Sequence, residues 1–227
     1  MTRRTFDQEL NRLEGEVLAL GNQVEEALVE SVQILKRRDF AASRQLIESD
    51  RVVNERRYAI ESEVLTLIAT QQPMAGDLRL LAAILEIVTE LERMGDYAKG
   101  IARINLMIGE QPLLKPLIDL PIMADKVRAM LHSALEAFVR RDAERARAIP
   151  AQDDEVDALY NQIQRELFSY ILADPHTYQQ ANFLMWAAHN LERAADRVIN
   201  LCERVVYTVS GELMELGSDD TGIESLT

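Results

Sequence analysis

The sequence predicts an all-α fold of two tandem, pseudo-repeated three-helix bundles with long antiparallel helices. Hydrophobic residues make up 48% of the 227 residues but aromatic residues only 5%, and the chain has 9 glycines and 6 prolines. This composition is typical of packed helices rather than of a fold with many tight turns. The second observation is an internal repeat, which divides a chain long enough for two cores into two similar halves.

The repeat covers all three helices of each half. Residues 27–50 align without a gap on residues 130–153, an offset of 103, and at the third helix the offset falls to 100. There the chain reads Leu91-Glu92-Arg93-Met94-Gly95-Asp96 and then Leu191-Glu192-Arg193-Ala194-Ala195-Asp196. A loop between the second and third helices has therefore lost three residues, while the helices keep their register.

Each predicted helix has its own signal. The first helix of each unit carries apolar residues at 3–4 spacing, such as Val17, Leu20 and Val24, and the residues Asp39 and Asp142 that follow it are placed to cap the second helix. The second helices end near Ala69 and Leu172, where Pro73 and Pro175 break the pattern before the third helices. We expect each helix to approach 30 residues, roughly 45 Å.

The domain boundaries follow from proline. Pro112, Pro116 and Pro121 mark a linker over residues 110–121, between a first bundle at 1–109 and a second at 122–216. Residues 217–227 mix Gly, Ser, Asp and Thr without apolar periodicity and are predicted to form a disordered tail. The apolar Trp186 is expected in the core of the second bundle, with a dimer interface as the alternative.

Composition excludes several classes of protein. The net charge of −13 argues against a nucleic-acid partner. The longest apolar run, residues 78–88, contains Glu86 and is too short to span a bilayer, so membrane contact is expected only through partners. The N-terminus does not read as a signal peptide, and Cys202 is the only cysteine, which favours the cytoplasm. Phosphate-loop and dinucleotide fingerprints are absent, so we expect no nucleotide hydrolysis by this protein alone.

The repeated Glu-x-x-x-Asp motif predicts two metal sites. Like charges four residues apart on a helix repel, so a counterion is expected between them. In an antiparallel hairpin, residues equally far from the turn lie level, which brings carboxylates of the second helix beside the motif. The predicted ligands are Asp50, Asn54, Glu92 and Asp96 in the first cluster, and Asp153, Asp157, Glu192 and Asp196 in the second. Such oxygen ligands suit iron, Mg, Mn, Ca or similar ions, among which the sequence does not choose.

An alternative without metal also fits the spacing. Arg93 and Arg193 stand three residues before Asp96 and Asp196, and they could neutralise these carboxylates as ion pairs on the helix surface. His189 stands three residues before Glu192 and could share its face. Its counterpart in the first unit is Thr89, so a histidine ligand would not be common to both clusters.

These motifs resemble the PhoU family of phosphate-transport accessory and signalling proteins. The matching stretches are Leu-Glu-Arg-Met-Gly-Asp-Tyr-Ala at 91–98, Asn-Leu-Glu-Arg-Ala-Ala-Asp-Arg at 190–197, Gln-Gln-Pro-Met-Ala-Gly-Asp-Leu-Arg at 71–79 and Asp-Asp-Glu-Val-Asp at 153–157. The resemblance implies a cytoplasmic, non-enzymatic homodimer that binds metal at Glu92, Asp96, Glu192 and Asp196. One departure is Gly100, where the second unit has the Asn200 that is frequent in the family, so the first site is expected to be weaker or differently coordinated.

The same resemblance implies partners and a role. They are the ATPase subunit of the phosphate ABC transporter (PstB-like) and the sensor histidine kinase (PhoR-like), between which an adapter keeps phosphate-starvation genes off when phosphate is plentiful. Two other hypotheses for the function stay open. A carboxylate-bridged dimetal oxidase of ferritin type would need Glu-x-x-His pairs, which are missing. A purely structural helical scaffold would not need two like-charged faces.

Overall fold

The computed structural model describes residues 3–216, and the predicted tail at 217–227 lies outside this range. The described chain contains helices and no strand. Its elements are α1 (Arg3–Arg37), α2 (Phe40–Gln71), α3 (Ala75–Ile108), α4 (Asp119–Arg140), α5 (Ala143–Ala148), η1 (Pro150–Gln152), α6 (Asp153–Ala173), η2 (Pro175–Thr177) and α7 (Tyr178–Ser210). The predicted all-α class with two helical units is confirmed, and α3 and α4 are joined by the segment 109–118 that holds Pro112 and Pro116.

The two units differ in their second helix. In the first unit all three helices exceed 30 residues, with 35, 32 and 34. In the second unit α4 has 22 residues, and the expected second helix is divided into α5, η1 and α6. The prediction of one continuous helix here was wrong, because Pro150 has no backbone N–H and its ring prevents a regular helical turn before it.

The turn between the first two helices is the same in both units. Asp39 accepts a hydrogen bond from the backbone N–H of Ala42 (2.9 Å), and Asp142 accepts one from Arg145 (2.9 Å), so both predicted N-caps are confirmed. Before each cap the chain takes a left-handed conformation, with φ of 59° at Arg38 and 54° at Arg141. The repeat therefore extends to backbone geometry.

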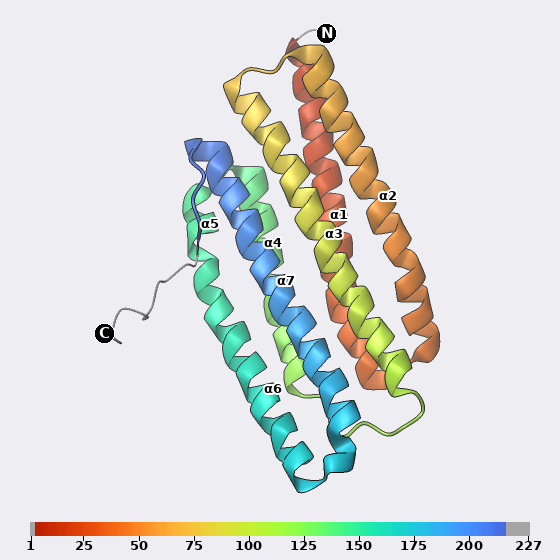
Figure 1. Cartoon of the computed structure of the whole chain (residues 1–227). Coiled ribbons are helices and arrows are strands. Elements are labelled where there is room, and N and C mark those ends of the chain that lie inside the picture. Colours follow the sequence, from red (N-terminus) through yellow and green to blue (C-terminus); the bar gives the residue numbers. More distant parts are fainter. Residues whose placement is uncertain (1–2, 217–227) are drawn as a thin grey trace, which may run out of the picture.

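The two units lie side by side and share a hydrophobic core (Figure 1). Helix α3 packs against α7, and α1 packs against α4, while α2 and α6 flank the assembly on opposite sides (Figure 1). At the second of these crossings, a Cβ on Gly21 would lie 2.4 Å from Cδ1 of Leu135, so only glycine allows this approach of α1 to α4. The α3–α7 contact brings the two acidic motifs into adjacent helices.

Two sequence expectations about surface and membrane can be compared with the structure. Trp186 is 49% exposed and packs beside Phe183, which corrects the prediction that it belongs to the core. Its repeat counterpart is the exposed Glu86, so position 186 lies on the outer face of its helix. Within residues 3–216, no helix combines the length and hydropathy required of a membrane span.

Candidate functional site

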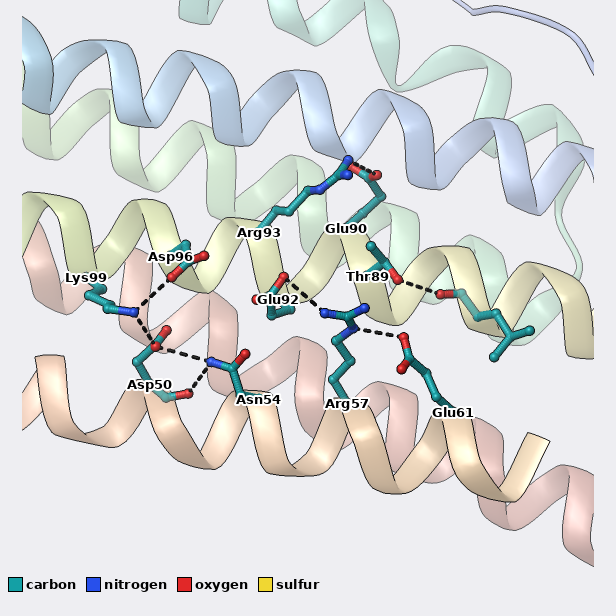
Figure 2. Close-up of polar contacts among 11 residues, drawn as sticks. Asp50, Asn54, Arg57, Glu61, Thr89, Glu90, Glu92, Arg93, Asp96 and Lys99 are labelled. Carbon is teal, nitrogen blue, oxygen red and sulfur yellow. Dashed lines mark hydrogen bonds and ion pairs between the residues drawn. The ribbon is translucent and has the colours of Figure 1, made fainter. Parts of the chain in front are cut away.

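The first acidic cluster forms where α2 and α3 lie level, and a lysine occupies its centre (Figure 2). The ammonium group of Lys99 donates to Asp50 Oδ2 (2.6 Å) and to Asp96 Oδ1 (3.0 Å). Asn54 donates its amide to the same oxygen of Asp50 (3.2 Å). Asp50, Asn54 and Asp96 lie together, as predicted from their equal distances from the turn. Lys99 was not predicted here, and its positive charge lies between the two carboxylates.

Glu92 completes the first cluster beside a second cation. Its Oε2 lies 3.7 Å from Nη1 of Arg57, whose Nε donates to Glu61 (2.8 Å), as Figure 2 shows. Burial raises the pKa of Glu92, and the neighbouring charge of Asp96 raises it further. Two side chains of the protein itself, Lys99 and Arg57, therefore supply the positive charge that the sequence led us to expect from a metal.

Arg93 and Arg193 do not form the predicted ion pairs with Asp96 and Asp196. Arg93 donates to Glu90 (2.9 Å) rather than to Asp96. In Figure 2 Arg93 and Glu90 point toward α7, away from the side of α3 that carries Glu92 and Asp96. On a helix Arg93 neighbours the residues three before and three after it, Glu90 and Asp96, and it pairs with Glu90. The alternative without metal is right about neutralisation at the first cluster but wrong about the cation.

The second cluster keeps its carboxylates and loses both cations. By the repeat, Lys99 corresponds to Ile199 and Arg57 to Tyr160. Within residues 3–216, no lysine or arginine nitrogen lies within 4.0 Å of a carboxylate oxygen of the second cluster, whose members are Asp153, Asp157, Glu192 and Asp196. Two of their oxygens, Asp153 Oδ1 and Glu192 Oε2, are buried without a hydrogen-bond partner, although His189 lies near the second. Asp50 Oδ1 is also without a partner, but the other oxygen of Asp50 is held by Lys99 and Asn54.

The pKa values of all four carboxyls in the second cluster are raised. Burial, together with the charges of Asp157, Asp196 and Glu192, raises the pKa of Asp153 to about 7. Burial raises the pKa of each of the other three carboxyls as well, with the charge of Asp196 adding to the shift at Asp157 and Glu192. At Asp196 burial acts alone, and the charges of Arg197 and Arg193 oppose it. A group of partly buried carboxyls with raised pKa values favours protons or cations.

His189 lies beside this cluster, as its spacing predicted. Its Nδ1 is 3.1 Å from Glu192 Oε2, and its ring lies 6.0 Å from that of Tyr160. The contact lowers the pKa of Glu192, against the larger effect of burial. The second unit thus has an imidazole where the first unit has Thr89, and a phenol ring where the first unit has Arg57. Only the second of these replacements removes a fixed positive charge from the cluster.

The donor set of the second cluster fits a hard cation better than that of the first, because no lysine or arginine within residues 3–216 contacts its oxygens. The side chains would still have to rotate, since no three His, Cys, Asp or Glu side chains among residues 3–216 converge closely enough to hold an ion as they stand. Rotation is open to Asp157, which is exposed, and to Asp196, which is half-buried.

Gly100 does not belong to the first cluster. A Cβ at this position would lie 3.1 Å from the amide nitrogen of Asn190 on α7, and its counterpart Asn200 donates to Glu90 of α3 (3.2 Å). Both positions lie at the contact between α3 and α7, where one helix provides a side chain and the other provides space. Gly100 therefore faces α7 rather than the first cluster, and the expectation that it weakens a first metal site stays a prediction. Within the clusters themselves, one difference is Lys99, whose counterpart is Ile199.

Comparison with known proteins places this chain in a family. A family model described as "PhoU domain" matches the chain twice, at residues 17–104 and 120–205. The PhoU homologue of Clostridium acetobutylicum is 33% identical over 95% of this chain and 99% of its own length. The Escherichia coli K12 protein is 33% identical over 95% of this chain and 90% of its own. Both are named phosphate-specific transport system accessory proteins.

Two solved structures of PhoU proteins have the same fold as this chain. The crystal structure of the phosphate transport system regulatory protein PhoU from Streptococcus pneumoniae superposes with a TM-score of 0.86 at 32% identity, covering 93% of this chain and all of that one. PhoU from Pseudomonas aeruginosa gives a TM-score of 0.85 at 33% identity, covering 91% of this chain and all of that one. These names describe accessory and regulatory proteins rather than enzymes, as predicted for this chain.

Proposed function

The chain belongs to the PhoU family, and we propose that it is a regulatory accessory protein of a phosphate-specific transport system that holds a metal ion at its second acidic cluster. The observation that supports the metal is the group of four carboxylates with raised pKa values, none of which pairs with a lysine or arginine within residues 3–216. Asp153, Asp157, Glu192 and Asp196 would hold the ion through oxygen, and the ion would supply the positive charge that the cluster lacks.

At the first cluster we propose that Lys99 takes the place of a metal. The ammonium group already contacts Asp50 and Asp96, and those hydrogen bonds raise the pKa of Lys99. A divalent ion there would have to displace a charge that is held at 2.6 Å from a carboxylate 93% buried. The two predicted metal sites are therefore unequal in this proposal, with binding confined to the second cluster.

The proposed partners follow from the family. The relatives are named for the phosphate-specific transport system, and we extend to this chain the prediction that it contacts the transporter ATPase subunit and a sensor histidine kinase as a cytoplasmic negative regulator. Recovery of either partner on tagged protein from phosphate-replete cells, and less of it from starved cells, would support this role. A homodimer stays a prediction as well.

The metal proposal is tested with protein purified without a metal-affinity tag and stripped with chelator. Binding of Mn²⁺ and Mg²⁺ is measured by equilibrium dialysis with elemental analysis, in the parent and in Asp157→Asn and Asp50→Asn variants. We expect Asp157→Asn to abolish saturable binding and Asp50→Asn to leave it intact. Equal loss in both variants, or no saturable binding by the parent, would overturn the proposal.

A gain-of-binding variant provides an independent check. Lys99→Ile reproduces at the first cluster the residue found in the second, and it frees the carboxylates of Asp50 and Asp96. We expect this variant to bind more metal than the parent. If it folds, as judged by circular dichroism, and binds no more than the parent, then Lys99 is not what keeps metal from the first cluster.

A further inference from the structure

The arginines of the two repeated motifs meet between the two units. Arg93 of α3 and Arg193 of α7 line one pocket of about 380 Å³, together with Arg197, Tyr97 and Asp96. This pocket, which we call the arginine pocket, lies between α3 and α7 and shares Asp96 with the first acidic cluster. Figure 2 shows Arg93 extending from α3 toward α7. Three guanidinium groups therefore gather at one place in a protein whose net charge is −13.

The charges of these arginines are only partly compensated. Arg93 and Arg197 share one carboxylate, that of the buried Glu90, at 2.9 and 3.4 Å. Asp96 lies in the pocket wall, but it is already held by Lys99 at 3.0 Å. Arg193 makes no ion pair within residues 3–216; its guanidinium lies over the Tyr97 ring at 5.6 Å from the centroid.

A hydrogen-bond donor is also left without a partner. Nε of Arg197 is buried and donates to no acceptor, and the Arg197 side chain is 19% exposed. A buried donor without an acceptor costs about 1–3 kcal/mol, so a ligand that provides an acceptor recovers this energy. Guanidinium groups present several donors in a plane and bind oxyanions with charge-assisted, often bidentate hydrogen bonds.

We propose that the arginine pocket binds a tetrahedral oxyanion of the phosphate type. Donors from both helices surround the space, which suits an anion with oxygens in several directions better than a carboxylate with two oxygens in one plane. Free inorganic phosphate and sulfate share this chemistry, and the binding experiment distinguishes them. The proposal does not depend on metal at the second cluster.

The site bridges the two units, so occupancy has a structural consequence. Arg93 and Tyr97 belong to α3, while Arg193 and Arg197 belong to α7. A bound anion would contact both helices at the contact between units and would stabilise their present arrangement by mass action. Phosphate bound there would then act on the relative position of the two acidic clusters, which the same helices carry.

The test is isothermal titration of the metal-stripped protein with inorganic phosphate, sulfate and acetate at constant low ionic strength, because salt screens exposed charges. The variants are Arg193→Gln, which breaks no ion pair, and Arg197→Gln, with Arg51→Gln as the matched control. Arg51 is 80% exposed on α2 and pairs only with Glu55. Thermal melts show that each variant is folded.

We expect saturable binding of phosphate, with sulfate weaker and acetate weakest. Each pocket variant should lose about tenfold to hundredfold in affinity, because one hydrogen bond to a charged group contributes about 1.5–3 kcal/mol. The control should match the parent. Absence of saturable phosphate binding, an equal loss in the control, or affinity unchanged in Arg193→Gln would each overturn the proposal. Sulfate binding as tightly as phosphate would identify a general oxyanion site and overturn the preference for phosphate.

Discussion

Equivalent substitutions in the two acidic clusters should change stability in opposite directions. Asp153 and Asp50 occupy corresponding positions of the repeat, yet Asp153 lies among three other carboxylates while Asp50 is held by Lys99. We predict that Asp153→Asn stabilises the metal-free protein at pH 8 and that Asp50→Asn destabilises it. The comparison isolates the electrostatics, because both changes replace an oxygen by an amide group of the same size.

The magnitude follows from the surroundings of each residue. A pKa of Asp153 raised from 3.8 to about 7 would correspond to about 4 kcal/mol if it were fully expressed. Because Asp153 is only partly buried, solvent screening reduces this to about 1–2 kcal/mol, and the α6 N-terminus, which favours a negative charge, removes about 0.3–1 kcal/mol. We expect a net gain of about 1 kcal/mol. Asp50→Asn should cost about 1–2 kcal/mol, since a charge-assisted hydrogen bond is lost while Lys99 retains Asp96.

The assay is urea unfolding in chelator, followed by circular dichroism at 222 nm. The sign of the pH dependence provides a second check. The folded-state pKa of Asp153 lies above its unfolded value, so its penalty is absent below pH 3.8 and grows as the pH rises to about 7. The gain from Asp153→Asn should therefore be larger at pH 8 than at pH 5. Two shifts of the same sign at pH 8 would refute the idea that only the second cluster lacks a cation.

Three further predictions concern the core and the contact between units. Burial raises the pKa of Glu25, 3.4 Å from His132, above its unfolded value of 4.5, so Glu25→Gln should raise the melting temperature at pH 7.5 more than at pH 4.5. Burial raises the pKa of the Cys202 thiol to about 12, so a thiol reagent at pH 8 should react only after urea unfolds the chain, and rapid reaction of native protein would contradict this. Gly21→Ala should lower the urea midpoint, equivalent to about 1–3 kcal/mol, by overpacking against Leu135; Gly15→Ala, with no atom near its Cβ, should raise it slightly.

Much of the fold could be predicted because it depends on local signals. Apolar spacing, caps and prolines are read within one helix, and the repeat confirms each signal by a second copy. The unbroken second helix predicted for the second unit was wrong at Pro150. Its position within an otherwise helical pattern was visible in the sequence, but the match of residues 130–153 to residues 27–50 favoured an unbroken helix. The break costs the second unit one backbone hydrogen bond that its first-unit counterpart retains.

The candidate site was predictable in part. Equal distance from the turn placed Asp50 beside Asp96, because that argument needs only the rise of a helix. Lys99 was not predicted, although it lies three residues after Asp96. It stands outside the repeated Glu-x-x-x-Asp motif, which contains only acidic ligands. The second unit has Ile199 where the first unit has Lys99, and this difference between the repeats is the sequence signal that points to Lys99. Glu90 and the arginine pocket depend on how α3 packs against α7, which no spacing within one unit determines.

The geometry of the motif explains why one duplicated segment makes two kinds of site. Along a helix, Glu and Asp of Glu-x-x-x-Asp share a face, while the Arg that follows Glu lies about 100° around the axis. When α3 and α7 pack together, the acidic faces turn outward to α2 and α6 and remain separate, whereas the arginines converge. Separate clusters can diverge independently, as Lys99 and Ile199 do. A shared pocket cannot, because a change in either arginine alters the same site, so the central pocket is where the two units must act together.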